Sequence, residues 1–146
     1  MKNFSVTREK IELSPLIEWV QDRNCGAITT FMGTVRELTN GKKTIFLEYE
    51  AYQEMAEKML QKIGEETLEK FDCSKIAIVH RIGRLEIGDV AVAIAVSSPH
   101  RDASFKGCRY AIEKIKELVP IWKKEHGEDG SFWVSSQSGA RGEERK

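Results

Sequence analysis

The chain has 146 residues, of which 40% are hydrophobic, and its 23 lysines and arginines equal its 23 aspartates and glutamates. This length suits one compact domain with a sizeable core, and the zero net charge supplies no field that would hold a nucleic acid or an anionic membrane. The longest apolar run, Val90 to Val96, is too short to span a bilayer, and the first eight residues lack the apolar stretch of a secretion signal. We therefore expect a cytoplasmic protein with one domain, residues 1–138, and a flexible tail, residues 139–146.

The first third of the chain predicts a short helix and two strands. Ser14 followed by Pro15 is typical of a helix start, because serine caps helices and proline fits the first helical position, and this helix should end before Gly26. Residues 27–35 are rich in threonine, β-branched and aromatic side chains, and apolar residues alternate with polar ones over 44–50. These two segments predict strands joined by a polar loop.

The middle of the chain predicts a long helix and a central hairpin. Residues 51–70 carry apolar side chains at helical spacing. Isoleucines alternate with other residues over 76–82, and residues 90–96 are apolar enough for a strand buried on both faces. Glycines between these two segments favour turns.

A second long amphipathic helix is expected after Asp102, a plausible cap, and Pro120 should end it. Beyond it come residues 121–125, to which no regular element is assigned, then a polar loop closed by Asp129 and Gly130 and a last short strand over 131–136. The order is too irregular for repeated βαβ units. The fold class is therefore predicted to be α+β, with a mostly antiparallel sheet and two long amphipathic helices.

The end of the strand before the second long helix suits an anion. Free backbone N–H groups and the positive end of the helix dipole should lie there beside His100 and Arg101. The alternative is that Arg101 pairs with a nearby carboxylate and His100 is an ordinary surface residue. On spacing alone, both interpretations remain open.

Two further places concentrate positive charge. Lys116, Lys123 and Lys124 flank an apolar, aromatic stretch that could shield them from water and make them usable in proton transfer, although a solvated helix end gives the same pattern. Arg36 follows the strand that contains Phe31, and an arginine fork binds oxyanions, although strand-end arginines are often only solubilising.

The remaining reactive side chains predict no metal site, cofactor or nucleophile. The histidines show no paired ligand spacing, and His80 falls on the isoleucine face of its strand, which indicates a hydrogen-bonded core residue. The three cysteines form no CxxC pair and leave one over in any disulfide scheme, so we expect reduced, mostly buried thiols. They are Cys25, Cys73 and Cys108.

Five segments carry a more specific signal together than any of them carries alone. In chain order they are Gly33–Arg36, Leu47–Tyr52 with Met55–Glu57, His80–Gly83, Ser97–Arg101, and Lys116 with Pro120–Glu125. In sequence, order and spacing, they resemble the large, catalytic subunit of molybdopterin synthase, and the likeness runs from the first strand nearly to Trp133. The resemblance implies an α/β-hammerhead fold.

The resemblance also implies an activity. Members of this family are sulfurtransferases of molybdenum cofactor biosynthesis that convert cyclic pyranopterin monophosphate into the dithiolene of molybdopterin. The sulfur comes from a small, ubiquitin-like subunit, which carries a thiocarboxylate on its C-terminal Gly-Gly and inserts that tail into the large subunit. No cofactor is implied.

By the same resemblance, the catalytic residues are Lys116, Lys123 and Glu125, the last being the acidic residue close to the two lysines. Lys123 would orient the thiocarboxylate and Lys116 would act in proton transfer or charge stabilisation. The residues implied to hold the pterin and its phosphate are Phe31, Arg36, His100 and Arg101.

Family members assemble as a homodimer of large subunits with a small subunit at each end, and each pocket draws basic residues from both large subunits. Some relatives carry an arginine shortly after the residues that match Trp133 and Val134, whereas here the next basic residue is Arg141. Two other classes stay open from the residues alone. They are a binding module that senses phosphorylated metabolites without converting them, and a structural partner of a ubiquitin-like protein.

Overall fold

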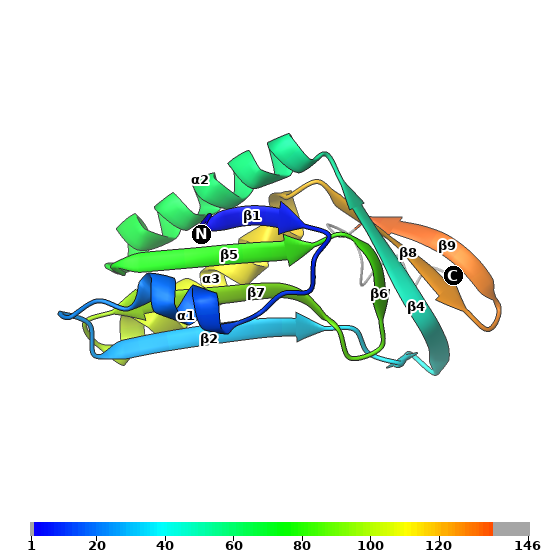
Figure 1. Cartoon of the computed structure of the whole chain (residues 1–146), viewed down its shortest axis with the longest axis horizontal. Helices are drawn as coiled ribbons and strands as arrows, with labels where there is room; N and C mark the ends of the chain where they lie inside the picture. Colours follow the sequence, from blue (N-terminus) through cyan, green and yellow to red (C-terminus); the bar gives the residue numbers. More distant parts are fainter. Residues whose placement is uncertain (1, 136–146) are drawn as a thin grey trace.

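The structure is a computed structural model that describes residues 2–135, in which two β-sheets stand side by side (Figure 1). The larger layer is a four-stranded sheet in the order β1-β5-β7-β2. Its strands are β1 (Phe4–Thr7), β5 (Lys75–Arg81), β7 (Val90–Ser98) and β2 (Ala27–Thr34). The β1–β5 pair is parallel, and both pairs made by β7 are antiparallel.

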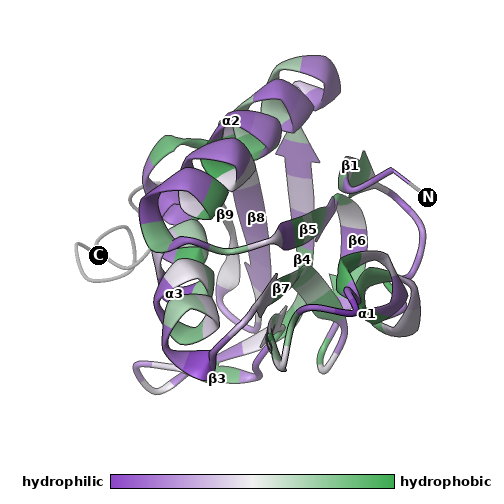
Figure 2. Ribbon diagram, turned by 90° about the vertical axis from the view of Figure 1, so that its left-hand side faces the viewer, coloured by the Kyte–Doolittle hydropathy of each residue, from purple (hydrophilic) through white to green (hydrophobic). Residues whose placement is uncertain are grey.

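Helices cover both faces of this sheet (Figure 2). The two long helices, α2 (Gln53–Phe71) and α3 (Arg101–Leu118), enclose the main core on one face, where Leu60, Ile94 and Ile115 are buried. The short helix α1 (Ser14–Val20) packs on the other face and forms a smaller cluster. β5 and β7 are therefore buried on both sides. This was predicted for β7 from its continuous apolar sequence but not for β5, where only alternation was expected.

The second sheet is built around the long strand β4 (Lys42–Ala51). β4 pairs with β6 and β8 along its two edges, β9 pairs with β8, and β3 makes a small hairpin with the start of β4. The bounds of these strands are β3 (Leu38–Thr39), β6 (Gly83–Glu86), β8 (Ile121–Gly127) and β9 (Gly130–Ser135).

The α+β class, the mostly antiparallel pairing and both long helices are confirmed. The strands predicted over 27–35 and 44–50 exist but belong to different sheets, and the turn between them closes the β3–β4 hairpin instead. Asn40 and Gly41 both have positive φ there, as a tight hairpin turn requires. The predicted central hairpin pairs as expected, β5 with β7, but β6 leaves between them to join β4.

Several local predictions need correction. Asp102 is not a cap: the cap position of α3 is His100 without a side-chain bond, and Asp102 pairs with Lys106 one turn on. Ser14 is already helical, and the cap position of α1 is Leu13. Residues 121–125, to which no element was assigned, begin β8.

The predicted last strand is present as β9, while residue 136 and the predicted tail over 139–146 lie outside the described residues. Among the residues described, no helix is long and apolar enough to cross a membrane.

Candidate functional site

Lys116, on the last turn of α3, lines a small pocket of about 100 Å³ between that helix and the two sheets. We call it the lysine pocket. The other side chains that shape it include Phe31, Thr34, Tyr49, His80 and Ile115. Phe31 and Lys116, two residues that the resemblance assigns to the site from distant parts of the chain, therefore meet in one cavity.

The floor of the lysine pocket is a row of residues that cross three neighbouring strands. The strand register places His80 beside Val92 and Val92 beside Gly33. A Cβ atom on Gly33 would lie 2.9 Å from Cγ1 of Val92, closer than side chains approach. Glycine at this position therefore allows the strands to pack without filling the space below Lys116.

Lys123 and Glu125 lie on one face of β8, because residues two apart on a strand point the same way. Nζ of Lys123 is 3.3 Å from Oε2 of Glu125, and the two side chains are only 21% and 11% exposed. This face also carries the buried residues Leu47 and Leu85. The ion pair is thus shielded from water, which strengthens its electrostatic interaction.

Tyr49 connects this ion pair to the lysine pocket. It stands directly opposite Lys123 in the β4–β8 register, and its ring lines the pocket that contains Lys116. Burial, followed by the negative charge of Glu125, raises the pKa of Tyr49 to about 12. The phenol therefore keeps its proton at neutral pH.

His80 is the hydrogen-bonded core histidine that the sequence predicts. It is 5% exposed, and its Nδ1 donates to the carbonyl oxygen of Arg81 at 2.9 Å, since a carbonyl only accepts. Burial is the main cause that lowers its pKa to about 4, and the positive charge of Lys116 adds to the effect. His80 is therefore neutral at neutral pH, although it lines the pocket.

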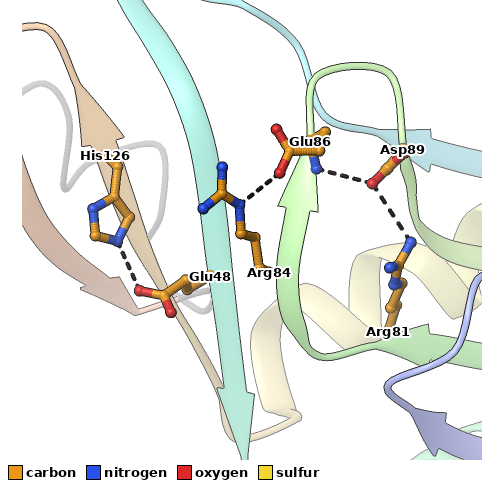
Figure 3. A network of polar contacts seen from close by, with 6 residues as sticks. All are labelled: Glu48, Arg81, Arg84, Glu86, Asp89 and His126. Atoms are coloured by element: carbon orange, nitrogen blue, oxygen red, sulfur yellow. Dashed lines mark hydrogen bonds and ion pairs between the residues drawn. The ribbon is translucent and has the colours of Figure 1, made fainter.

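The opposite face of the second sheet is polar and serves structure (Figure 3). Nε2 of His126 lies 2.7 Å from Oε1 of Glu48, and its ring stacks on Phe46 with 4.1 Å between the ring centroids. Nε of Arg84 donates to Glu86 at 2.6 Å, and Asp89 accepts from the backbone of Glu86 while it pairs with Arg81. The contact between His126 and Glu48 joins β8 to β4, and the Arg84 guanidinium lies over the ring of Phe46, 3.8 Å from its centroid, which joins β6 to β4.

His100 and Arg101 do not join the lysine pocket within one chain. Both are exposed at the start of α3, and Arg101 lies 15 residues before Lys116, or about 22 Å along the helix axis at 1.5 Å per residue. Arg36 is also exposed, but it follows the pocket residue Thr34 by two positions and so stands near the lysine end. One chain therefore presents two separate groups of predicted site residues.

The cysteines are free, and only Cys108 is fully buried, while Cys25 and Cys73 are partly exposed. Burial is the main cause that raises the pKa of Cys73 and of Cys108 to about 11. Thiols with such a pKa are scarcely ionised at neutral pH and are weak nucleophiles. Neither of them lines the lysine pocket.

The position of Tyr49 beside both Lys123 and the lysine pocket was missed from sequence. The alternation of Ile45, Leu47 and Tyr49 predicts that the three share a strand face, but it does not show that Lys123 stands across from this face. Only a strand over 121–127, paired with β4, would have indicated that Tyr49 and Lys123 are neighbours.

Comparisons with known proteins identify the family of the chain. The family model described as MoaE protein matches residues 6–118. The molybdopterin synthase catalytic subunit of Halalkalibacterium halodurans is 57% identical over 136 residues, which cover 93% of this chain and 87% of the relative. The subunit of the same name from Bacillus subtilis is 56% identical over 137 residues, which cover 94% of this chain and 87% of the relative.

A solved structure gives the same result for the fold. The crystal structure of molybdopterin synthase from Staphylococcus aureus superposes with a TM-score of 0.89 at 53% identity, covering 92% of this chain and 98% of the matched chain. The fold and the sequence therefore lead to one assignment. This chain belongs to the MoaE protein family.

Proposed function

We propose that this chain is the catalytic subunit of molybdopterin synthase, a sulfurtransferase of molybdenum cofactor biosynthesis. It transfers sulfur from the C-terminal thiocarboxylate of a small ubiquitin-like subunit to cyclic pyranopterin monophosphate, and the product is the dithiolene of molybdopterin. Relatives that share more than half of its residues carry this name. A cytoplasmic location remains a prediction.

The observation that carries the proposal is the convergence of Lys116 with the shielded Lys123–Glu125 pair around Tyr49. The donor tail is an anion, the pterin carries a phosphate, and attack of the sulfur generates further negative charge. Lys123, which is shielded from water, stabilises such charge better than a fully exposed lysine would, and Lys116, an exposed residue that lines the pocket, adds a second positive charge. The site therefore has the electrostatics that each step of the transfer requires.

The two lysines take different parts. Lys123 orients the thiocarboxylate, because Glu125 fixes the direction of its ammonium group at 3.3 Å. Lys116 lines the pocket itself and moves protons or stabilises charge on the reacting groups. Glu125 is a positioning residue that acts through Lys123.

The phosphate is held by His100 and Arg101 of a second large subunit. These residues stand about 22 Å from Lys116 along α3, so one chain cannot bring both groups to one substrate. In a homodimer the start of α3 from one protomer meets the lysine pocket of the other, with Arg36 and Phe31 near the junction. A small subunit at each end completes a heterotetramer.

Reconstitution tests the proposal. The purified chain, mixed with a thiocarboxylated small subunit and the cyclic pterin, should yield the dithiolene product, followed by mass spectrometry. Lys116→Ala should lower the rate at least 100-fold, within the range that acid–base and electrostatic catalysis contribute. Lys114→Ala is the matched control, because Lys114 lies on the same helix and pairs with Glu117.

Two outcomes would argue against the proposal. Full activity of a folded Lys116→Ala variant would refute the assignment of that lysine. Tight binding of the pterin by the wild-type chain without any conversion would indicate a binding module instead of an enzyme.

A further inference from the structure

Tyr49 is the one described side chain that the strand register and the pocket lining assign to both halves of the site. On β4 it faces Lys123 across the β4–β8 pair, where opposing side chains stand about 5 Å apart at Cβ. Tyr49 is also among the residues that line the lysine pocket together with Lys116. A group bound between the two lysines would therefore lie against the phenol.

We infer that Tyr49 is a further catalytic residue of this site, whose hydroxyl donates a hydrogen bond to the anionic thiocarboxylate end of the donor tail. This inference rests on the proposed function. The Tyr49 hydroxyl would be an uncharged hydrogen-bond donor beside the charged residues Lys116, Lys123 and Glu125.

The surroundings keep the hydroxyl a donor. Burial and the nearby negative charge of Glu125 both disfavour the phenolate, and the pKa of Tyr49 is raised to about 12. A phenolate would repel an incoming anion, whereas a protonated phenol attracts it. Because the proton remains in place far above neutral pH, the donor is present throughout the working range of the enzyme.

The ring of Tyr49 is held in a fixed orientation. It meets the ring of His80 edge to face, with 5.2 Å between centroids and 73° between planes. His80 is itself fixed by its hydrogen bond to the carbonyl of Arg81 and is neutral, so it adds no competing charge. A preorganised hydrogen-bond donor loses little entropy when the anion binds. It therefore stabilises the transition state more than a mobile donor does.

A purely structural role makes a different prediction. The ring packs against the core, and a phenylalanine would keep that packing and the contact with His80. If packing alone matters, Tyr49→Phe will behave as the wild type does. Tyrosine and phenylalanine at position 49 will differ in activity only if the hydroxyl group takes part in the reaction.

The test compares three chains in the reconstituted reaction: wild type, Tyr49→Phe and Tyr110→Phe. Tyr110 is the matched control, because its hydroxyl donates to Glu66 at 3.0 Å on the outer side of the two long helices, away from the pocket. Tyr49→Phe should lower kcat/KM for the thiocarboxylated subunit about 100- to 1,000-fold, as removal of one preorganised donor does. Tyr110→Phe should stay within twofold, and thermal unfolding should show both variants folded.

The outcomes separate this inference from the proposed function. If Tyr49→Phe keeps the wild-type kcat/KM while Lys116→Ala is inactive, the inference is wrong and the proposed function stands. If Tyr49→Phe is slow but its unfolding temperature also falls by more than that of Tyr110→Phe, both variants are assayed again well below their unfolding temperatures. A loss that persists there supports the role of the hydroxyl, and a loss that disappears overturns the inference. A wild-type chain that makes no product refutes both.

Discussion

His80 shows how a single buried side chain couples the pocket to the stability of the fold. It is 5% exposed in the wall of the lysine pocket and remains neutral while Lys116 lies nearby. The neutral imidazole therefore adds no positive charge to the wall of the pocket.

This neutrality predicts a pH dependence of stability. Folding lowers the pKa of His80 from 6.5 to about 4, so between these values the unfolded chain binds a proton that the folded chain excludes. Stability from this group is complete above pH 6.5 and falls as the pH drops toward 4, by about 1.4 kcal/mol per pH unit. Urea unfolding between pH 7.5 and 5.0 measures this slope.

The variant His80→Asn should reduce that slope by about one proton, because asparagine does not titrate. His100→Asn makes the same substitution at an exposed position at the start of α3 and serves for comparison. Equal slopes for wild type and His80→Asn would show that His80 titrates normally in the folded chain.

At the scale of elements, hydrophobic periodicity was enough to predict α2, α3, β5 and β7. Their buried positions recur every three to four residues or form continuous apolar runs, which is the signal that burial against a sheet imposes. The periodicity does not extend to every apolar residue of the two helices: Met55 and Leu118, near the helix ends, are 56% and 43% exposed.

β8 was missed because its inward residues include charged ones. Ile121, Lys123 and Glu125 face the core side, but a lysine and a glutamate at alternate positions do not resemble a buried strand face. The charges are tolerated there because they pair with each other. The charged pair on the inward face thus both obscured the strand pattern and forms part of the candidate site. Sequence patterns are expected to fail most often at functional sites, where polar residues replace apolar ones.

The close packing of α2 against α3 gives a prediction at this scale. A Cβ atom on Gly107 would lie 2.9 Å from Sγ of Cys73 and 3.1 Å from Cγ2 of Thr67. Gly107→Ala should therefore lower the free energy of unfolding by about 1–3 kcal/mol, the usual cost of overpacking, although alanine favours helices. Chemical denaturation measures the change.

Replacing the thiol that blocks the space should restore part of the loss. In the Gly107→Ala background, Cys73→Ala removes Sγ and should recover stability, whereas Cys25→Ala, which does not adjoin Gly107, should not. A Gly107→Ala chain as stable as the wild type would show that the helices separate at little cost.

At the scale of the whole molecule, the sequence predicted the types of residue in the site but not their distribution. Phe31 and Lys116 meet in the pocket, and Lys123 and Glu125 pair as expected from the resemblance. The distance from Arg101 to Lys116 depends on α3 running unbroken between them, which no local motif expresses. Arg141 lies outside the described residues, so its part in the pocket stays a prediction.

A site divided between two protomers has a distinctive consequence for mixed dimers. A dimer of one Lys116→Ala chain and one Arg101→Ala chain contains one pocket that lacks both side chains and one that keeps both. Co-expression with two different affinity tags allows this hybrid to be isolated. Each parental homodimer lacks one of the two side chains in every pocket and should be nearly inactive.

The turnover rate of this purified hybrid tests most directly whether each site combines Lys116 of one protomer with Arg101 of the other. It should reach about half of the wild-type rate per dimer, because one of its two equivalent pockets is intact. A hybrid as inactive as its two parents would contradict the account, since Lys116 and Arg101 would then not serve one substrate from two chains.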